Sequence, residues 1–131
     1  MNLSRGGKIF FAHRELACPA TGKVILNDEF AARLVQLRRD FNAPMTLTSA
    51  CRSASHNAAI GGHRKSLHVY DHPAHDTGGT AAVDVAWPAD RVRFLRCALA
   101  NGFSVGVARG FIHIDLREVV DMPQMCFGYG G

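Results

Sequence analysis

The sequence FSVGVARGFIHIDL, residues 103–116, decides the fold of this chain of 131 residues. Residues 103–107 and 111–116 are rich in Val, Ile and Phe, which favour strands, and residues 108–110 between them have the composition of a turn. We therefore predict two neighbouring strands that are joined into a hairpin.

Upstream of the hairpin, the spacing of apolar residues predicts two longer helices. The first is capped by Asn27-Asp28 and runs to about Phe41. The second is bracketed by Pro88 in its first turn and by Gly102 beyond its end. The expected buried positions are Phe30, Leu34, Leu37 and Phe41 in the first helix and Val92, Leu95 and Leu99 in the second.

Shorter elements fill the rest of the chain. We predict strands at 45–49 and 81–86, a short helix at 55–60 ended by Gly61-Gly62, and a polar loop at 69–79. This order of elements favours a single α+β domain over residues 1–131, with helices packed on a small, mainly antiparallel sheet. Its core is expected at about residues 10–117, followed by a C-terminal tail at about 118–131, of which the last ten residues should be weakly ordered.

Composition limits the classes of protein. A hydrophobic content of 47% and a charged content of 20% are ordinary for a globular domain, and no apolar run is long enough to span a membrane. The net charge of +4 suits nucleic acid or an anionic cell-wall polymer. Since the basic residues are scattered and not interleaved with aromatic ones, we do not expect nucleic-acid binding.

The N-terminus and the cysteines bear on the compartment. The apolar run at residues 9–12 is too short for a signal peptide, so we expect synthesis in the cytoplasm without one. Cys18, Cys51, Cys97 and Cys126 include no C-x-x-C pair, and we expect free, mostly buried thiols.

Two histidines and two aspartates in the second half carry the strongest chemical signal. His113 and Asp115 lie two apart on the predicted strand and share a face. Asp84 lies between two valines, where a carboxylate is costly to bury unless it is paired or metal-bound. With His68 at a loop edge, the set offers the three ligands of a catalytic zinc site.

Each of these residues also has a simpler interpretation. His68 could be a surface histidine, Asp84 an ion-pair partner, and His113 a core histidine oriented by Asp115. A non-haem iron site also uses a His-x-Asp pair, but its second histidine follows downstream, and no histidine follows Asp115 in this chain.

Several motifs together resemble those of a known family. They are Ser49-Ala50-Cys51-Arg52-Ser53, His56-Asn57, Gly61-Gly62, Ser66-Leu67-His68, Ala82-Val83-Asp84 and Gly110-Phe111-Ile112-His113-Ile114-Asp115. With these motifs in this order along the sequence, the chain resembles the zinc D-Ala-D-Ala carboxypeptidase and L-alanyl-D-glutamate endopeptidase family. The fold of that family is shared with the Hedgehog signalling domain. The likeness is to its small phage and prophage members.

The resemblance implies roles for individual residues. His68, Asp84 and His113 would bind one zinc ion per chain. Arg52 would bind the substrate's carboxylate or the developing oxyanion, for which a guanidinium is suited. Ser66 would orient the histidine loop or contact substrate. Many relatives carry their catalytic acid at the position of Gly110, so we expect Asp115 to serve as the general base instead.

The chain departs from the family pattern at other positions as well. Cys51 stands where an aromatic residue is common. A longer segment, residues 69–79, separates the ligand histidine from the ligand aspartate. That segment could be a solvated loop, contribute acid/base groups or replace a metal ligand, through Asp71, His72, His75 and Asp76.

The resulting expectation is a zinc-dependent peptidase that hydrolyses peptidoglycan stem peptides through metal-activated water, as an endolysin-like endopeptidase or a D,D-carboxypeptidase. The enzyme would be a monomer that reaches the cell wall after holin-type release. The alternative is a catalytically silent zinc-binding structural module of a phage or prophage.

Overall fold

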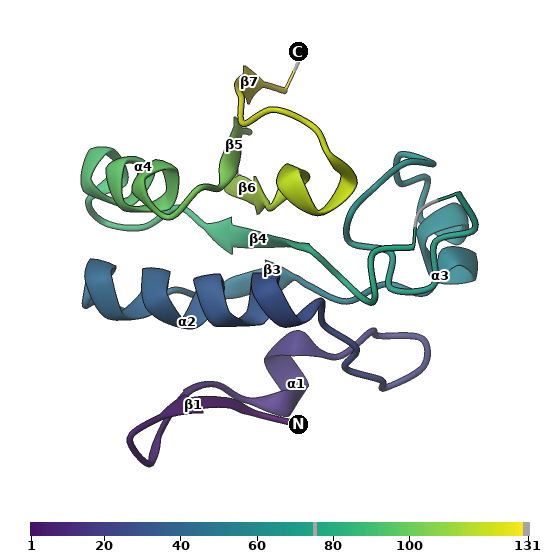
Figure 1. Ribbon diagram of the computed structural model, residues 1–131, viewed down its shortest axis with the longest axis horizontal. Coiled ribbons are helices and arrows are strands. Elements are labelled where there is room, and N and C mark those ends of the chain that lie inside the picture. The colour runs from purple at the N-terminus through teal and green to yellow at the C-terminus, as the bar shows by residue number, and fades with distance from the viewer. Residues whose placement is uncertain (75, 130–131) are drawn as a thin grey trace.

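A five-stranded mixed sheet is the centre of the computed structural model, which describes residues 1–74 and 76–129. The strand order is β3-β4-β6-β5-β7, and Figure 1 shows these strands rising above α2 with α4 beside them. The strands are β3 (Leu47–Ser49), β4 (Ala82–Ala86), β5 (Ser104–Val107), β6 (Phe111–Asp115) and β7 (Cys126–Gly128). The helices are α1 (His13–Leu16), α2 (Asp28–Phe41), α3 (Ala54–Ala59), α4 (Arg91–Ala100) and the 3-10 helix η1 (Arg117–Val120).

The sheet confirms the predicted α+β class. β4 pairs antiparallel with both β3 and β6, and β5 pairs antiparallel with β6 in the expected hairpin. Ile112 and Ile114 are fully buried on one face and join the core that α2 and α4 cover, while His113 and Asp115 occupy the other face. The alternation along β6 therefore separates the core from the polar face, as the period of a strand requires.

Helix α2 follows its sequence signals closely. The Asn27 side chain accepts a hydrogen bond from the Phe30 backbone N–H at 2.9 Å, which satisfies a donor of the first turn. At the other end Asn42 takes the left-handed conformation, with φ of 50°, and stops the helix. The predicted stripe of Phe30, Leu34, Leu37 and Phe41 is buried.

The predicted buried face of α4 is wrong for Val92 and Leu99, which are exposed, whereas Leu95 is partly buried and packs against the core. Val92 is 62% exposed, whereas Phe94 and Ala98 are fully buried. Phe94 packs edge-on against Phe41 of α2 with ring centroids 5.3 Å apart, and this large contact sets the rotation of the helix. The start also differs, because Asp90 caps the helix by accepting from the Arg93 N–H. Pro88 therefore precedes the helix instead of lying in its first turn.

Cys126–Gly128 of the tail forms β7 and belongs to the sheet, so the prediction of weak order is wrong for this strand, while Gly130 and Gly131 lie outside the described residues. This strand pairs parallel with β5 at Val105↔Cys126, Gly106↔Phe127 and Val107↔Gly128. The pairing occupies the outer edge of β5, whose backbone groups need partners. A strand of three residues is too short to show a sequence period.

An N-terminal hairpin was not foreseen. β1 (Leu3–Arg5) and β2 (Lys8–Phe11) pair antiparallel around Gly6-Gly7, and both glycines have positive φ, as two-residue hairpin turns require. Phe11 is fully buried and ties the hairpin to the core.

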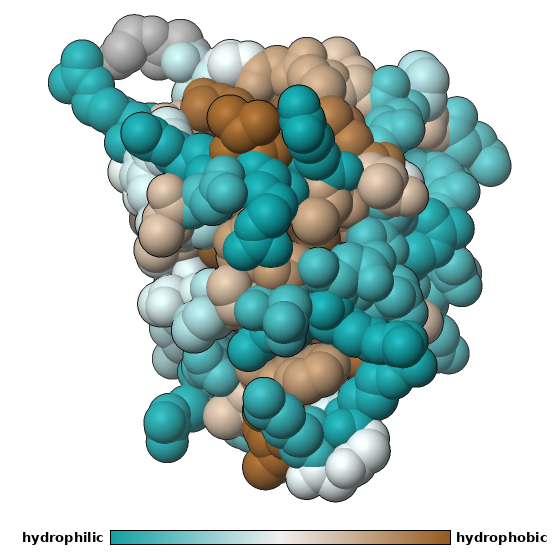
Figure 2. Space-filling view, turned by 90° about the vertical axis from the view of Figure 1, so that its left-hand side faces the viewer, coloured by the Kyte–Doolittle hydropathy of each residue, from teal (hydrophilic) through white to brown (hydrophobic). Residues whose placement is uncertain are grey.

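The exposed surface and the state of the cysteines agree with most of what the composition predicts. Figure 2 shows a face that is largely hydrophilic, with hydrophobic side chains in separate patches. All four cysteines are free, as predicted, but only Cys18 and Cys51 are buried and Cys126 is exposed. None of the described helices is long and apolar enough to cross a membrane.

Candidate metal centre

Strand pairing brings the first two residues of the site together. Asp84 on β4 lies directly opposite His113 on β6, and the Asp84 Oδ1 to His113 Nδ1 distance is 3.0 Å. Both residues are 7% exposed. Antiparallel register therefore fixes an imidazole beside a carboxylate on the polar face of the sheet.

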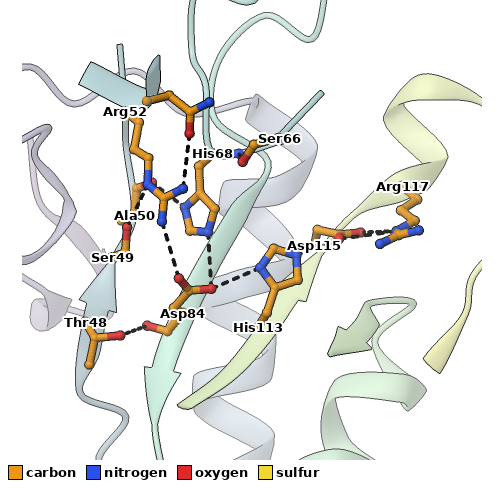
Figure 3. Close-up of polar contacts among 11 residues, drawn as sticks. Thr48, Ser49, Ala50, Arg52, Ser66, His68, Asp84, His113, Asp115 and Arg117 are labelled. Carbon is orange, nitrogen blue, oxygen red and sulfur yellow. Dashed lines mark hydrogen bonds and ion pairs between the residues drawn. The ribbon is translucent and has the colours of Figure 1, made fainter. Parts of the chain in front are cut away.

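His68 reaches the same carboxylate from a loop. Its Nε2 lies 3.2 Å from Asp84 Oδ1, and this contact is drawn as a dashed line in Figure 3. The loop is held by its backbone, since the His68 carbonyl accepts from the Arg52 N–H and from the Thr80 hydroxyl, at 3.0 and 2.7 Å. The Ser66 hydroxyl also accepts from the His68 N–H at 3.2 Å. These bonds fix the ring's position relative to β3 and β4.

The hydrogen bonds of the two rings decide which nitrogen of each is available. His68 Nδ1 lies 2.7 Å from the Ala50 carbonyl oxygen, which can only accept, so Nδ1 carries the proton. His113 Nε2 lies 2.7 Å from Asp115 Oδ2, and the carboxylate likewise accepts. When the rings are neutral, His68 Nε2 and His113 Nδ1 are thus left with lone pairs that face Asp84, and a ring that takes up a proton donates to Asp84 from this nitrogen instead.

Three acceptor atoms therefore converge on one point. One ligand atom each from His68, Asp84 and His113 lies within 4.8 Å of the others. Lone pairs and a carboxylate gathered in this way fit a cation, and two imidazoles with one carboxylate are a donor set that zinc favours. Among the described residues this is the one such group that could hold a metal ion.

Electrostatics agree with a site built for positive charge. Burial opposes the ionisation of Asp84, but hydrogen bonds from His113 and His68 outweigh it and hold the pKa of this carboxyl well below its usual range. Burial lowers the pKa of His68. For His113, burial also favours the neutral ring, yet Asp115 and Asp84 outweigh it and raise its pKa.

The contacts of Asp115 fit an orienting role, which is an alternative to the predicted role of general base. Its Oδ2 binds His113 Nε2, and the Arg117 Nε donates to its Oδ1 at 3.1 Å. The two nitrogens of an imidazole point in different directions. Asp115 binds Nε2 of His113, so it lies on the opposite side of this ring from Nδ1, which faces Asp84. A base must lie within hydrogen-bond reach of the proton that it takes. Asp115 instead forms the carboxylate–histidine pair that commonly orients a metal ligand.

Arg52 faces the site but is held by three protein acceptors. Its Nε donates to the Ser49 hydroxyl at 3.1 Å, one terminal nitrogen donates to Asn57 Oδ1 at 3.2 Å, and the other lies 3.5 Å from Asp84 Oδ2. A side chain on Gly62 would overlap the Asn57 amide, so the glycine leaves room for the hydrogen bond between Arg52 and Asn57. The motif from Ser49 to Gly62 thus positions a guanidinium beside Asp84.

Comparison with known proteins identifies the family. The profile described as Peptidase M15 matches residues 11–115 and thus spans the elements that carry the site. The chain belongs to the peptidase M15 family. No curated protein matches it. Membership supports a metallopeptidase, and M15 peptidases are zinc-dependent, which agrees with the cluster of His68, Asp84 and His113.

In this M15 peptidase the described part of the inserted segment lies apart from the cluster. Asp71 accepts from the Ala54 N–H at 2.7 Å, and His72 Nε2 contacts the Arg64 carbonyl oxygen at 2.8 Å. Both line a separate hollow with Asp76. These contacts hold the loop and favour the interpretation as a surface segment over that of a replacement ligand. His75 lies outside the described residues.

The cluster lies in a pocket of about 640 Å³ with a polar and an aromatic side. The polar side includes Arg52, His63, Lys65 and Ser66. The other side includes Phe111 together with Phe127 and Tyr129, which sequence reasoning missed because they lie in the supposed tail. Phe127 and Tyr129 are two residues apart, and this alternation of aromatic residues was the signal that could have indicated a strand facing the pocket.

Proposed function

We propose that this M15 peptidase is a zinc-dependent hydrolase of peptidoglycan stem peptides, acting as an endopeptidase or a D,D-carboxypeptidase. The observation that carries the proposal is the convergence of two imidazole lone pairs and a carboxylate in a solvent-accessible pocket. A structural zinc site is usually closed by four protein ligands, whereas a catalytic site offers three and leaves room for water.

We assign the residues as follows. His68, Asp84 and His113 would hold zinc, which when bound polarises the scissile carbonyl and lowers the pKa of a water molecule toward 7. Asp115 orients His113, and Ser66 fixes the loop of His68. Asp115 beside His113 Nε2 and the Ala50 carbonyl beside His68 Nδ1 hold the two rings in the tautomers that zinc needs.

The charge of the pocket supports an anionic peptide as substrate. Arg52, His63, Lys65 and Arg117 all line it, and the Asp84 and Asp115 carboxylates are paired within the site. Stem peptides carry carboxylates near the bonds that such enzymes cut. Arg52 is placed to bind one of them or the developing oxyanion, since a guanidinium matches planar oxygens.

The resemblance to small phage and prophage members supports action at the cell wall after holin-type release, by a monomer that does not need nucleic acid. This part of the proposal rests on the motifs alone. It predicts lysis of cells when the protein is made together with a pore that opens the inner membrane.

Digestion of defined peptidoglycan, followed by mass spectrometry of the released muropeptides, tests the proposal and identifies the bond. We expect hydrolysis and about one zinc ion per chain. His68→Ala and His113→Ala should each lose most of the metal and the activity. His13→Ala is the matched control, because His13 is exposed and its ring contacts Met1 and Gly22 at the N-terminal end of the chain, away from the cluster.

The outcomes distinguish the two hypotheses that the sequence suggested, an active zinc peptidase and a silent zinc-binding module. Zinc bound at this stoichiometry without digestion of any cell wall would favour the silent binding module. Retention of zinc in both histidine variants would refute the ligand assignment.

A further inference from the structure

The C-terminal strand places a tyrosine over a proposed metal ligand. The Tyr129 ring lies edge-on to the His113 ring, with centroids 6.3 Å apart and planes at 71°. It also contacts Phe111 at 5.5 Å and Phe127 at 5.6 Å, and the three rings make up the aromatic side of the pocket. This position is close to where the reacting peptide must lie.

Backbone pairing fixes the tyrosine there. The Tyr129 N–H donates to the Val107 carbonyl at 3.0 Å, which extends the parallel pairing of β7 with β5. Gly106 lies directly opposite His113 in the register of β5 and β6. A Cβ on Gly106 would overlap the Phe127 ring and approach the Tyr129 ring at 3.0 Å, so the glycine makes room for both aromatic side chains.

The hydroxyl of Tyr129 is available for a ligand. No residue that the structure describes forms a hydrogen bond with it, and Tyr129 lines the pocket while it remains 48% exposed. Arg52, another donor in the pocket, has a protein acceptor at each of its three nitrogens, so that the second N–H groups of its two terminal nitrogens are left for a substrate.

We propose that Tyr129 is a catalytic residue of this site, whose hydroxyl donates a hydrogen bond to the oxygen of the scissile carbonyl as negative charge builds on it. The inference rests on the proposed peptidase function. Water oxygen adds to the carbonyl carbon, the C–N bond breaks, and the protons of water end on the products. The phenol keeps its own proton throughout, so its part is electrostatic.

The decisive variant is Tyr129→Phe, because it removes the hydroxyl and keeps the ring that packs on His113. We expect kcat on a stem peptide to fall on the order of 100-fold, with KM changed by no more than about twofold, since a donor of this kind acts mainly in the transition state. Tyr70→Phe is the matched control. The Tyr70 hydroxyl bonds Thr21 and lies outside this pocket.

A second measurement does not depend on turnover. A phosphinic analogue of D-Ala-D-Ala mimics the tetrahedral species, and its affinity for the zinc-loaded protein should weaken on the order of 100-fold in Tyr129→Phe and stay unchanged in Tyr70→Phe. Zinc content should be equal in all three proteins. Gly106→Ala, which displaces the aromatic pair, should weaken the affinity too and add little in combination with Tyr129→Phe.

The two proposals fail in distinguishable ways. If the wild type does not cut stem peptides but the analogue binds it more tightly than it binds Tyr129→Phe, the assigned reaction is refuted and the role of Tyr129 stands. If Tyr129→Phe matches the wild type in analogue affinity, the role of Tyr129 is refuted, whatever the wild type cuts.

Discussion

Replacing Asp115 with asparagine separates its two possible roles. The substitution keeps the shape of a side chain that is 2% exposed and leaves an amide oxygen that can still accept from His113 Nε2. It removes the negative charge that pairs with Arg117 and polarises the imidazole. An orienting carboxylate and a general base therefore predict different losses.

The size of the effect follows from the hydrogen bond that is weakened. A charge-assisted bond such as the 2.7 Å contact between Asp115 and His113 is roughly twice as strong as a neutral one. Loss of such a partner usually lowers metal affinity about 10- to 100-fold. This corresponds to roughly 1.4–2.8 kcal/mol of binding free energy.

Competition with a chromophoric zinc chelator measures this affinity, and peptide hydrolysis is then followed at saturating zinc. The orienting role predicts weaker zinc binding with most of kcat restored by excess metal. Asp121→Asn is the control, because Asp121 is exposed and its left-handed conformation suits asparagine equally well. An unchanged zinc affinity together with a kcat that excess zinc does not restore would refute this reasoning and return Asp115 to the role of base.

Two further predictions concern metal binding and stability. The pKa of His113 is raised, so its protonated ring persists above pH 6.5 and competes with zinc. Apparent zinc affinity should fall about tenfold for each pH unit below that pKa, and a pH-independent affinity between pH 5 and 7 would contradict a role for His113. Phe94→Ala should destabilise the protein by about 3–5 kcal/mol in urea unfolding, because it empties the contact with Phe41. Val92→Ala, on the exposed side of the same helix, should change stability by no more than about 0.5 kcal/mol, and equal losses would mean that the face of α4 is misassigned.

The sequence could predict the strands of the site because their signals are local. Alternating residues place His113 and Asp115 on one face, and a carboxylate between valines marks Asp84 as exceptional. Neither signal says which ring nitrogen faces the neighbour. That choice depends on the Ala50 carbonyl and the Asp115 carboxylate, whose positions follow from tertiary packing.

The incorrect predictions share a cause. The buried face of α4 depends on where Phe41 lies in another helix, and β7 forms because β5 has an edge to pair with. Neither partner is near in sequence. Tyr129 was overlooked for the same reason, since nothing around it in the chain indicates that it lies over His113.

The balance of charge in the site links the proposed zinc centre with the proposed role of Tyr129. Asp84 and Asp115 carry two negative charges, Arg52 and Arg117 carry two positive ones, and the metal-facing nitrogens are neutral. A bound divalent cation would leave the centre with a net charge of about +2, since Asp84 and Asp115 are the only carboxylates among the described residues that line the pocket. An acid at the position of Gly110, as in many relatives, would lower that charge by one. Its absence favours stabilisation of a developing negative charge by neutral and cationic donors, which is the part that we assign to Tyr129 and Arg52.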